Sequence, residues 1–487
     1  MRTPLFGLAL VLVSGCLAPA SHRASYPVLP WDRRSDNESF RNQAPSPQSS
    51  AELPSRAVEE ARLPNGIRIL FIPRHDIPLV AVSIVVRRGA GDAPPGVAFL
   101  ASRLGPAGAE NRVEQEIRRT LDQTAWHTWV SYDAIEIGSK VPVGLLSEVF
   151  PVMADIIQEP AITETAFLRE RQRLVKMVSE DLGRSEDEND RMQGRLLFPP
   201  GHPYRATIFG SRPELEAIRP EEIKKFLAEQ VTPDQIVVVA VGDLALGQLS
   251  ALVQATLAKK SAPARSRAPA PTAPSAPTPS ATITLIDRPA LTQSLLTIAA
   301  IGPAVTDADF DSMALMNLLL GGMVTSRLNS RLREDLGYTY RAGSMIEARR
   351  GPAPFLAGTS VSQEKTGDSL REALAQIERM RTELVSDDEM ETAKARYLGL
   401  ALASCDSFDA SLHELIGIAV HDFPADESSR RLSRVLAVSK EDIRLVASKY
   451  LAPDRVRILV EGNAAAIRNQ IASLGLGAVD VIASQRR

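Results

Sequence analysis

The sequence is poor in the residues that most often bind metals or cross-link chains. Of its 487 residues, six are histidine and two are cysteine. No two histidines lie within five positions of each other, which excludes the helical zinc signatures His-Glu-x-x-His and His-x-x-Glu-His, where two histidines lie four positions apart. The two cysteines, Cys16 and Cys405, are too few for a disulfide framework or a cysteine-based zinc site. The sequence therefore contains no local zinc motif.

An excess of charge of one sign is also missing. The 56 basic and 59 acidic residues are intermingled and give a formal net charge of −3. Such a balance provides no basic surface of the kind that binds nucleic acid. The content of 44% hydrophobic and 24% charged residues is that of an ordinary globular protein. At ~100–200 residues per domain, the length predicts about two to four domains.

The N-terminal residues have the pattern of a bacterial lipoprotein signal. A basic start precedes an apolar run over residues 5–15, which is too short to span a bilayer as a helix of ~20 residues. The run ends in Val13-Ser14-Gly15-Cys16, which is typical of a lipobox, where small residues precede a cysteine that is lipidated. We therefore expect residues 1–15 to be a signal peptide and Cys16 to be lipidated; a plain secretory signal is the alternative.

A tether is expected to follow the lipidated cysteine. Residues 16–56 are rich in Ser, Pro, Asn and Arg and have little apolar periodicity, which indicates a flexible segment. No aspartate follows Cys16 as a retention signal, and in a Gram-negative host this favours anchoring in the outer membrane, facing the periplasm. Lipidation of Cys16 leaves Cys405 without a partner, and we expect Cys405 to be a buried structural thiol.

A proline-rich segment at 261–282 divides the remaining chain. It contains six prolines and almost no bulky apolar residue, which predicts a semi-rigid linker. Residues 218–243 and 438–463 align without a gap at an offset of 220, with five identical positions. Both stretches read as a helix, a Pro-Asp turn and a strand that ends in glycine. The repeat predicts two homologous halves, at 57–260 and 283–487.

Each half mixes strands and helices. Leu63-Pro64-Asn65-Gly66 predicts a hairpin turn before a strand. Strands are expected at 66–73, 79–89, 294–302 and 355–362, and helices at 144–158, 163–182, 366–384 and 387–404. Strands followed by helices predict an α+β fold, with antiparallel-rich sheets and packed helices, in place of a doubly wound fold.

Several blocks of the chain match one known family in the right order. They are RLPNGIRILFIPRHDIPLVAVSIVVRRGAGDAPPGVA at 62–98, GHPYRATIFGS at 201–211, TPDQIVVVAVGD at 232–243, LMNLLLGGMVTSRLNSRLREDLGYTY at 315–340 and APDRVRILVEGN at 452–463. On these blocks the chain resembles the insulinase (pitrilysin) superfamily of zinc peptidases, in particular the mitochondrial-processing-peptidase type and its bacterial relatives. The resemblance implies two halves that close on a peptide chamber like a clamshell.

The family's zinc motif is degenerate in this chain. The resemblance implies His-x-x-Glu-His on a helix in the first half, but the matching positions hold Phe99, Ser102 and Arg103. Phenylalanine has no lone pair for a metal, arginine is a permanent cation, and serine is a poor base. The family's further glutamate ligand would fall on or near Met177, and Glu180 close by is a single carboxylate. We therefore expect no metal and no cofactor in this chain.

The second half departs less from the family. The stretch from Leu332 to Tyr340 matches a segment in which an arginine and a tyrosine lie seven residues apart, here Arg333 and Tyr340. The resemblance implies that this pair donates hydrogen bonds to the substrate carbonyl beside the scissile bond and stabilises the oxyanion that develops there. A second register, Arg331 with Tyr338, is open. His202-Pro203-Tyr204 matches a family loop, which we interpret as a structural turn.

Two functions follow from the resemblance. In some members of the superfamily, one chain keeps the zinc motif and a second chain keeps the arginine–tyrosine pair. This chain fits the second role, as the non-catalytic subunit of a heteromeric periplasmic peptidase that acts on unfolded peptides, with zinc held by a paralogous partner. The alternative is an inert scaffold or peptide-binding protein with the same clamshell fold. Either way, any peptidase activity would require a partner chain.

Overall fold

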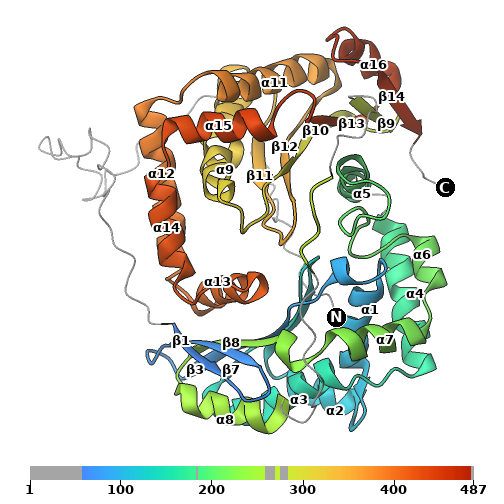
Figure 1. Cartoon of the computed structure of the whole chain (residues 1–487). Coiled ribbons are helices and arrows are strands. Elements are labelled where there is room, and N and C mark those ends of the chain that lie inside the picture. The colour runs from blue at the N-terminus through green and yellow to red at the C-terminus, as the bar shows by residue number, and fades with distance from the viewer. Residues whose placement is uncertain (1–57, 182–184, 258–268, 275–282, 484–487) are drawn as a thin grey trace, which may run out of the picture. The chain divides into compact units, whose positions relative to one another are not determined.

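Two six-stranded sheets organise the part of the chain that the computed structural model describes, residues 58–181, 185–257, 269–274 and 283–483 (Figure 1). These residues lie in one compact unit, Ser49–Arg487. The expected signal peptide, Cys16, the tether and most of the linker lie outside the described residues.

The first sheet has the strand order β1-β2-β8-β3-β7-β6. Strands β2 and β8 are parallel, and the other neighbours are antiparallel. As predicted, the turn before β2 closes a hairpin, in which Gly66 takes a φ of 97° and Arg62 pairs with Arg68. The strands of this sheet are β1 (Glu59–Arg62), β2 (Arg68–Pro73), β3 (Leu79–Val86), β6 (Ala125–Val130), β7 (Ile135–Pro142) and β8 (Ile236–Gly242); β4 (Gly108–Ala109) and β5 (Arg112–Val113) pair separately.

The second sheet repeats this topology. Its order is β11-β12-β10-β13-β9-β14, and its long strand β10, like β3 in the first sheet, has one antiparallel neighbour on each side. Only the last edge differs, because β14 runs parallel to β9 whereas β1 runs antiparallel to β2. The strands are β9 (Ile283–Asp287), β10 (Gln293–Gly302), β11 (Ala342–Ile346), β12 (Ala353–Ser362), β13 (Arg457–Gly462) and β14 (Val479–Ala483).

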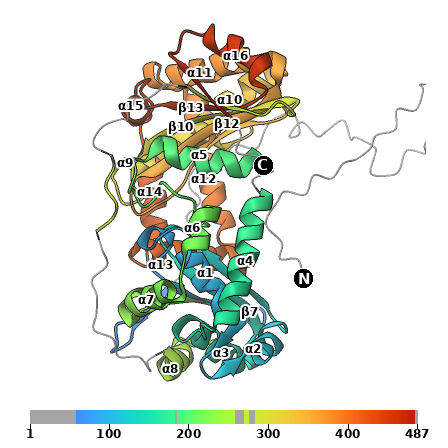
Figure 2. The same ribbon diagram turned by 90° about the vertical axis from the view of Figure 1, so that its right-hand side faces the viewer.

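Helices cover one face of each sheet and build two separate cores (Figure 2). The helices that precede the linker are α1 (Val97–Leu104), α2 (Glu114–Leu121), α3 (Leu146–Gln158), α4 (Glu164–Asp181), α5 (Ser185–Leu197), α6 (Arg212–Ala217), α7 (Pro220–Gln230) and α8 (Leu246–Leu257). Those that follow it are α9 (Asp309–Asn317), α10 (Arg327–Asn329), α11 (Thr366–Thr382), α12 (Asp387–Ala403), α13 (Phe408–His421), α14 (Glu427–Ala437), α15 (Lys440–Tyr450) and α16 (Ala464–Ala472). Two π-helical segments, η7 (Leu318–Gly322) and η8 (Ser330–Asp335), flank α10.

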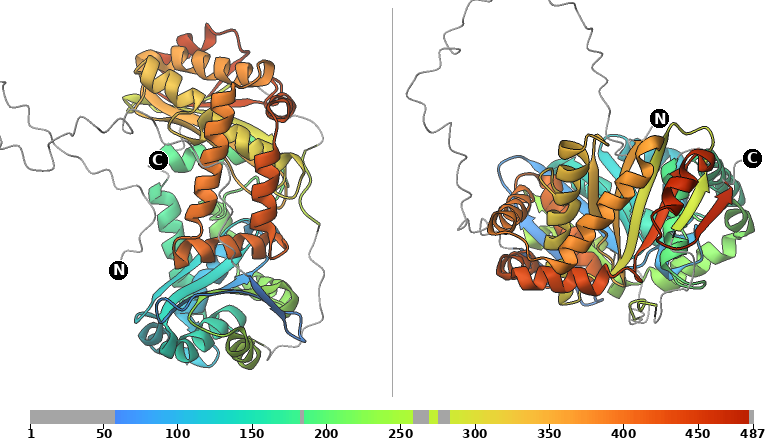
Figure 3. Two further views of the ribbon diagram at one scale, coloured as in Figure 1. Left: turned by 90° about the vertical axis from the view of Figure 1, so that its left-hand side faces the viewer. Right: turned by 90° about the horizontal axis from the view of Figure 1, so that it is seen from above.

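The other face of each sheet is covered by a helix from the opposite half (Figure 3). Phe408, Leu412 and Leu415 of α13 pack on β2, β3 and β8 of the first sheet. Reciprocally, α5 contacts β10 and β13 of the second sheet. Because β3 and β8 are buried on both faces, β8 is a continuous apolar run, and the apolar run of β3 is interrupted only by the buried Ser83. We call this reciprocal packing the exchange of α5 and α13. It joins the two halves by apolar contacts in addition to the linker.

The observed mixture of helices and mainly antiparallel strands confirms the predicted α+β fold. The expectation for Cys405 is wrong in one respect, because its thiol is only half-buried, just after α12, with Sγ 3.6 Å from the carbonyl oxygen of Ala401. No helix among the described residues is long and apolar enough to cross a membrane.

Candidate functional site

Helix α1 holds the three positions at which the family places its zinc motif. The helix begins after Gly96, whose φ of 84° is strained for any side chain, and a Cβ there would meet Leu215 and the carbonyl oxygen of Phe209. The ring of Phe99 packs edge-on against that of Phe209, with centroids 4.9 Å apart. The Ser102 hydroxyl is buried and donates a hydrogen bond of 2.7 Å to the carbonyl oxygen of Phe99. Phe99 therefore packs against a residue outside the helix, and the Ser102 hydroxyl is bonded within it.

Arg103 lies beside a buried carboxylate on the neighbouring helix α4. Its Nε is 3.9 Å from Oε2 of Glu170, whose side chain is 5% exposed. Two arginines of α4 also bind Glu170, Arg173 at 2.7 Å and Arg169 at 3.2 Å. Three guanidinium groups therefore surround one carboxylate, which is a cationic environment that disfavours a divalent metal ion.

The remaining expected ligand positions do not complete a zinc site. Met177 on α4 offers a thioether in place of the family's carboxylate, and the side chain of Glu180 lies outside the described ones. Within the described residues, no group of three or more His, Cys, Asp or Glu side chains is placed to hold a metal. The donor set at α1 and α4 thus does not fit zinc.

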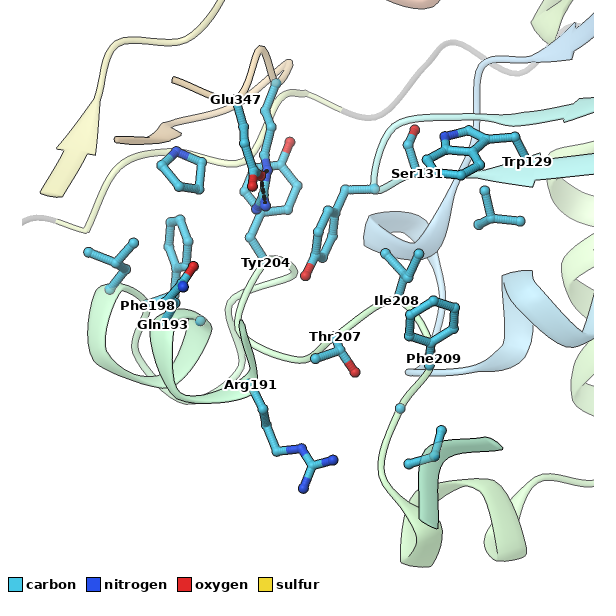
Figure 4. Close-up of a pocket in the computed structure, with 18 of the residues that line it drawn as sticks. Trp129, Ser131, Arg191, Gln193, Phe198, Tyr204, Thr207, Ile208, Phe209 and Glu347 are labelled. Atoms are coloured by element: carbon cyan, nitrogen blue, oxygen red, sulfur yellow. Dashed lines mark hydrogen bonds and ion pairs between the residues drawn. The ribbon is translucent and has the colours of Figure 1, made fainter. Parts of the chain in front are cut away.

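A largely apolar cavity of about 500 Å³ adjoins these positions (Figure 4). Met177 and Phe209, the neighbour of Phe99, both line it. On one side, β6 and the segment from α5 to Gly210 supply large side chains. These are Trp129, Phe198, Tyr204 and Ile208. On the other side, Glu347, Arg349 and Pro354 come from the second half. The cavity could take an apolar side chain or a short peptide segment.

Arg349 closes this cavity from the second half. Its guanidinium lies 4.0 Å from the centroid of the Tyr132 ring and 4.9 Å from that of Tyr204, and it forms an ion pair with Glu347. Cation–π contacts of this kind are strongest when they are buried, and Arg349 is buried.

A buried hydrogen-bond network joins the two halves next to Arg349. The Tyr204 hydroxyl donates to Oδ1 of Asp133 at 3.0 Å and accepts from the backbone N–H of Gly351 at 3.1 Å. The backbone N–H of Arg350 donates to Oδ2 of Asp133 at 2.8 Å. Burial and the nearby Asp133 carboxylate raise the pKa of the Tyr204 hydroxyl, so it remains a donor at neutral pH. We call Asp133, Tyr204, Arg350 and Gly351 the inter-half network.

The turn predicted at His202-Pro203-Tyr204 supports this network. The ring of His202 stacks on Phe198 at 4.4 Å, and its Nδ1 accepts from the backbone N–H of Tyr204 at 3.1 Å. Its Nε2 lies 3.3 Å from the carbonyl oxygen of Thr272, which assigns the neutral tautomer with a proton on Nε2. Desolvation lowers the pKa of His202, in agreement with that form.

The structure brings Arg333 and Tyr340 together at a second cavity. Arg333 lies in η8, the chain turns at Gly337 with a φ of 62°, and the Arg333 guanidinium carbon is 5.2 Å from the centroid of the Tyr340 ring. Both side chains line a cavity of about 530 Å³. Tyr340 lies outside the strands, because it precedes β11 by two residues, and its side chain is 85% exposed.

The alternative register, Arg331 with Tyr338, is engaged elsewhere. Arg331 binds Glu372 at 2.8 Å and Asp335 at 3.5 Å, and the ring of Tyr338 lies 4.9 Å from Nζ of Lys365. Arg331 and Tyr338 do not line the cavity that Arg333 and Tyr340 share. Of the two registers, Arg333 and Tyr340 form the pair that faces open space.

Sequence reasoning missed the inter-half network. The sequence indicates only a turn at Tyr204, whose partners Asp133 and Gly351 lie 71 residues before it and 147 residues after it in the chain. No local spacing signals such a contact. It also missed Arg341 and Arg396, which line the cavity of Arg333 and Tyr340 from two different elements.

Two related α+β halves, with a degenerate zinc helix in the first and an arginine–tyrosine pair in the second, define a peptidase-like chain without its own zinc motif. Comparison with known proteins supports this description of the chain. Residues 217–397 match the family model described as Peptidase M16 inactive domain. The zinc protease YmxG of Bacillus subtilis, which is itself uncharacterized, is 21% identical over 359 residues, covering 72% of this chain and 84% of the relative. The uncharacterized zinc protease Rv2782c of Mycobacterium tuberculosis is 22% identical over 424 residues, covering 83% and 94%.

Solved structures show the same fold. A peptidase M16 inactive domain from Pseudomonas fluorescens matches with a TM-score of 0.76 at 19% identity, covering 83% of this chain and 97% of that one. A protease from Helicobacter pylori matches with a TM-score of 0.75 at 16% identity, covering 84% and 100%. Over most of its length the chain is therefore similar to insulinase-like (M16) peptidases. The match to a family model described as inactive, together with Phe99, Ser102 and Arg103 at the positions of the zinc motif, indicates a non-catalytic M16-like protein.

Proposed function

We propose that this chain is the non-catalytic subunit of a heteromeric M16-type zinc peptidase, in which it completes the active site of a zinc-bearing partner chain. The observation that carries the proposal is the contrast between its halves. The zinc positions on α1 are occupied by Phe99 and Arg103, whereas Arg333 and Tyr340 lie together, partly exposed, at a cavity.

The roles of the two side chains follow from their chemistry. A guanidinium and a phenol are both hydrogen-bond donors, and Arg333 carries a permanent positive charge. Placed at the carbonyl oxygen beside the scissile bond, they would stabilise the negative charge that develops there. Zinc in the partner chain would supply the activated water. Loss of one such donor typically costs about 10²–10³ in kcat.

One of the relatives supports a division of the catalytic residues between two chains. A probable mitochondrial-processing peptidase subunit beta from Schizosaccharomyces pombe is 21% identical over 168 residues, covering 33% of this chain and 35% of the relative. Its name describes a subunit of a larger peptidase. By analogy, we place the present chain beside a paralogue that carries His-x-x-Glu-His.

The test is a cleavage assay on the complex. The chain is co-purified with the zinc-motif paralogue from the same genome, and hydrolysis of an unfolded peptide is measured with and without a chelator. Arg333→Ala should lower kcat by about 10²-fold and leave assembly intact. Arg331→Ala is the matched control, because it removes the arginine of the other register. Full activity of the Arg333→Ala complex would refute the assignment and favour an inert scaffold.

We further propose that lipidation of Cys16 anchors the chain in the outer membrane of a Gram-negative cell, facing the periplasm. The lipobox-like Val13-Ser14-Gly15-Cys16 supports this localisation. Metabolic labelling with a fatty acid and fractionation of the envelope test it. Cys16→Ser should abolish the label and release the protein from the membrane fraction, whereas Cys405→Ser should leave both unchanged.

A further inference from the structure

The cavity of Arg333 and Tyr340 contains two further arginines. Arg341 enters it from the residue before β11, and Arg396 enters it from α12. Three guanidinium groups from three different elements therefore line one cavity of about 530 Å³. Like charges that lie close together repel each other, which destabilises the arrangement. A negatively charged group that binds between them removes this repulsion.

The geometry of α12 explains why Arg396 faces this cavity. Glu389, Thr392 and Arg396 are spaced by three and four residues, which places them on one face of the helix. Glu389 holds that face against α10 through a two-point pair with Arg327, at 2.6 and 2.9 Å. Thr392 and Arg396, one and two turns further along, line the cavity.

The nearby carboxylates are already paired. Glu389 is held by Arg327, which lowers the pKa of that carboxyl to about 2, and Glu334 pairs with Arg333 at 3.3 Å. Arg341 and Arg396 are both exposed and form no ion pair with any carboxylate that the structure describes. The cavity therefore presents positive charge that the described part of the chain does not neutralise.

Apolar surface adjoins these charges. Val324 lines the same cavity and is 70% exposed, and the Tyr340 ring beside Arg333 is more exposed still. Exposed apolar groups next to free guanidinium groups suit a ligand that carries both apolar and acidic parts, as a peptide does.

We propose that Arg341 and Arg396 bind a carboxylate of the peptide whose backbone Arg333 and Tyr340 hold, so that this chain selects acidic peptides. The peptide part of this inference rests on the proposed function. The carboxylate belongs to a Glu or Asp side chain or to the C-terminus, since both offer two oxygens to a guanidinium. Arg341 and Arg396 are specificity-determining residues, distinct from the pair that contacts the reacting carbonyl.

The test measures binding to the full chain by fluorescence anisotropy with three labelled peptides. The first contains glutamates among leucines and serines and has an amidated C-terminus. The second replaces the glutamates with glutamines. The third keeps the glutamines and has a free C-terminal carboxylate. Tighter binding of the first peptide alone assigns the site to side chains, and tighter binding of the third assigns it to the C-terminus.

We expect the preferred acidic peptide to bind about tenfold more tightly than the amidated glutamine peptide at low salt, and the ratio to shrink as salt is added. The double variant Arg341→Gln/Arg396→Gln should reduce this ratio to near one. Arg212→Gln removes another exposed arginine, which lies on α6 in the first half and pairs with Glu216, and it should retain the ratio. Thermal melting checks that all variants fold.

Equal binding of the three peptides, or a preference that persists in the double variant, would overturn the inference. The cleavage assay separates this failure from that of the proposed function. If the acid preference is absent but Arg333→Ala still lowers cleavage by the complex, only the inference fails. If the preference is present but Arg333→Ala leaves cleavage unchanged, only the assignment of Arg333 fails.

Discussion

Removal of one hydroxyl from the inter-half network should measurably loosen the contact between the halves. Tyr204→Phe keeps the ring that packs on Phe198 and carries the cation–π contact with Arg349. It removes only the hydrogen bond to Asp133 and the acceptor of the Gly351 N–H. The variant therefore isolates the contribution of the hydroxyl.

The expected loss follows from the burial of the groups concerned. A hydrogen bond to a charged group contributes about 1.5–3 kcal/mol, and an unsatisfied buried N–H costs about 1–3 kcal/mol. Asp133 keeps its hydrogen bond from the Arg350 N–H, so its carboxylate is not left without a partner and the loss of stability is smaller. We expect a loss of about 3 kcal/mol in the free energy of unfolding, or about 6–12 °C in the Tm of the affected part.

The assay is thermal and urea unfolding, combined with hydrogen exchange at single amides. The Gly351 amide should exchange faster in Tyr204→Phe, because its acceptor is gone. Tyr450→Phe is the matched control, since its hydroxyl also donates to a carboxylate, that of Asp309 at 2.8 Å, but is only half-buried and lies within one half. The control should cost about 1 kcal/mol. A loss below about 1 kcal/mol for Tyr204→Phe, with unchanged exchange at Gly351, would refute the reasoning.

Three further predictions concern stability. The bond to Glu136 raises the pKa of His127, so its contribution should be complete below the unfolded pKa of ~6.5 and fade as pH rises through the folded value; urea melts across this range should lose that pH dependence in His127→Gln. The pKa of Glu389 is lowered to about 2 by Arg327, so its contribution should be present above pH ~4.5 and be lost as pH falls towards 2; Glu389→Gln melts should show less acid destabilisation. Leu415→Ala on α13, a fully buried side chain on the first sheet, should cost about 2–5 kcal/mol by urea unfolding, whereas Leu445→Ala, an exposed leucine on α15, should cost little.

The local elements of the fold could be predicted because their signals are local. The helices predicted at 144–158 and 387–404 appear as α3 (Leu146–Gln158) and α12 (Asp387–Ala403), since apolar spacing fixes which face is buried. The strand predicted at 294–302 appears within β10 (Gln293–Gly302). The exchange of α5 and α13 between the halves could not be predicted in this way. A helix pattern shows that a face is buried, but not which sheet covers it.

In the candidate site, too, the contacts between residues close in sequence could be predicted, and those between distant residues could not. Arg333 and Tyr340 are seven residues apart and joined by one turn, so a sequence motif could indicate that they meet. Arg341 and Arg396 are separated by 55 positions and line the same cavity because α12, which Glu389 joins to Arg327 of α10, packs beside the segment before β11. Charge composition gives no hint of this cluster, because a net charge of −3 averages over the whole chain.

The degenerate zinc positions are integrated into the packing of the first half, and this limits what a simple reversion could restore. Histidine at position 99 would lose the Phe99–Phe209 ring contact. Glutamate in place of Ser102, whose side chain is buried, would bring an unpaired charge into a helix–sheet contact, which costs several kcal/mol. Replacement of Arg103 would remove one of the three cations around the buried Glu170. Each step towards the zinc motif is therefore expected to destabilise this half before any metal can bind.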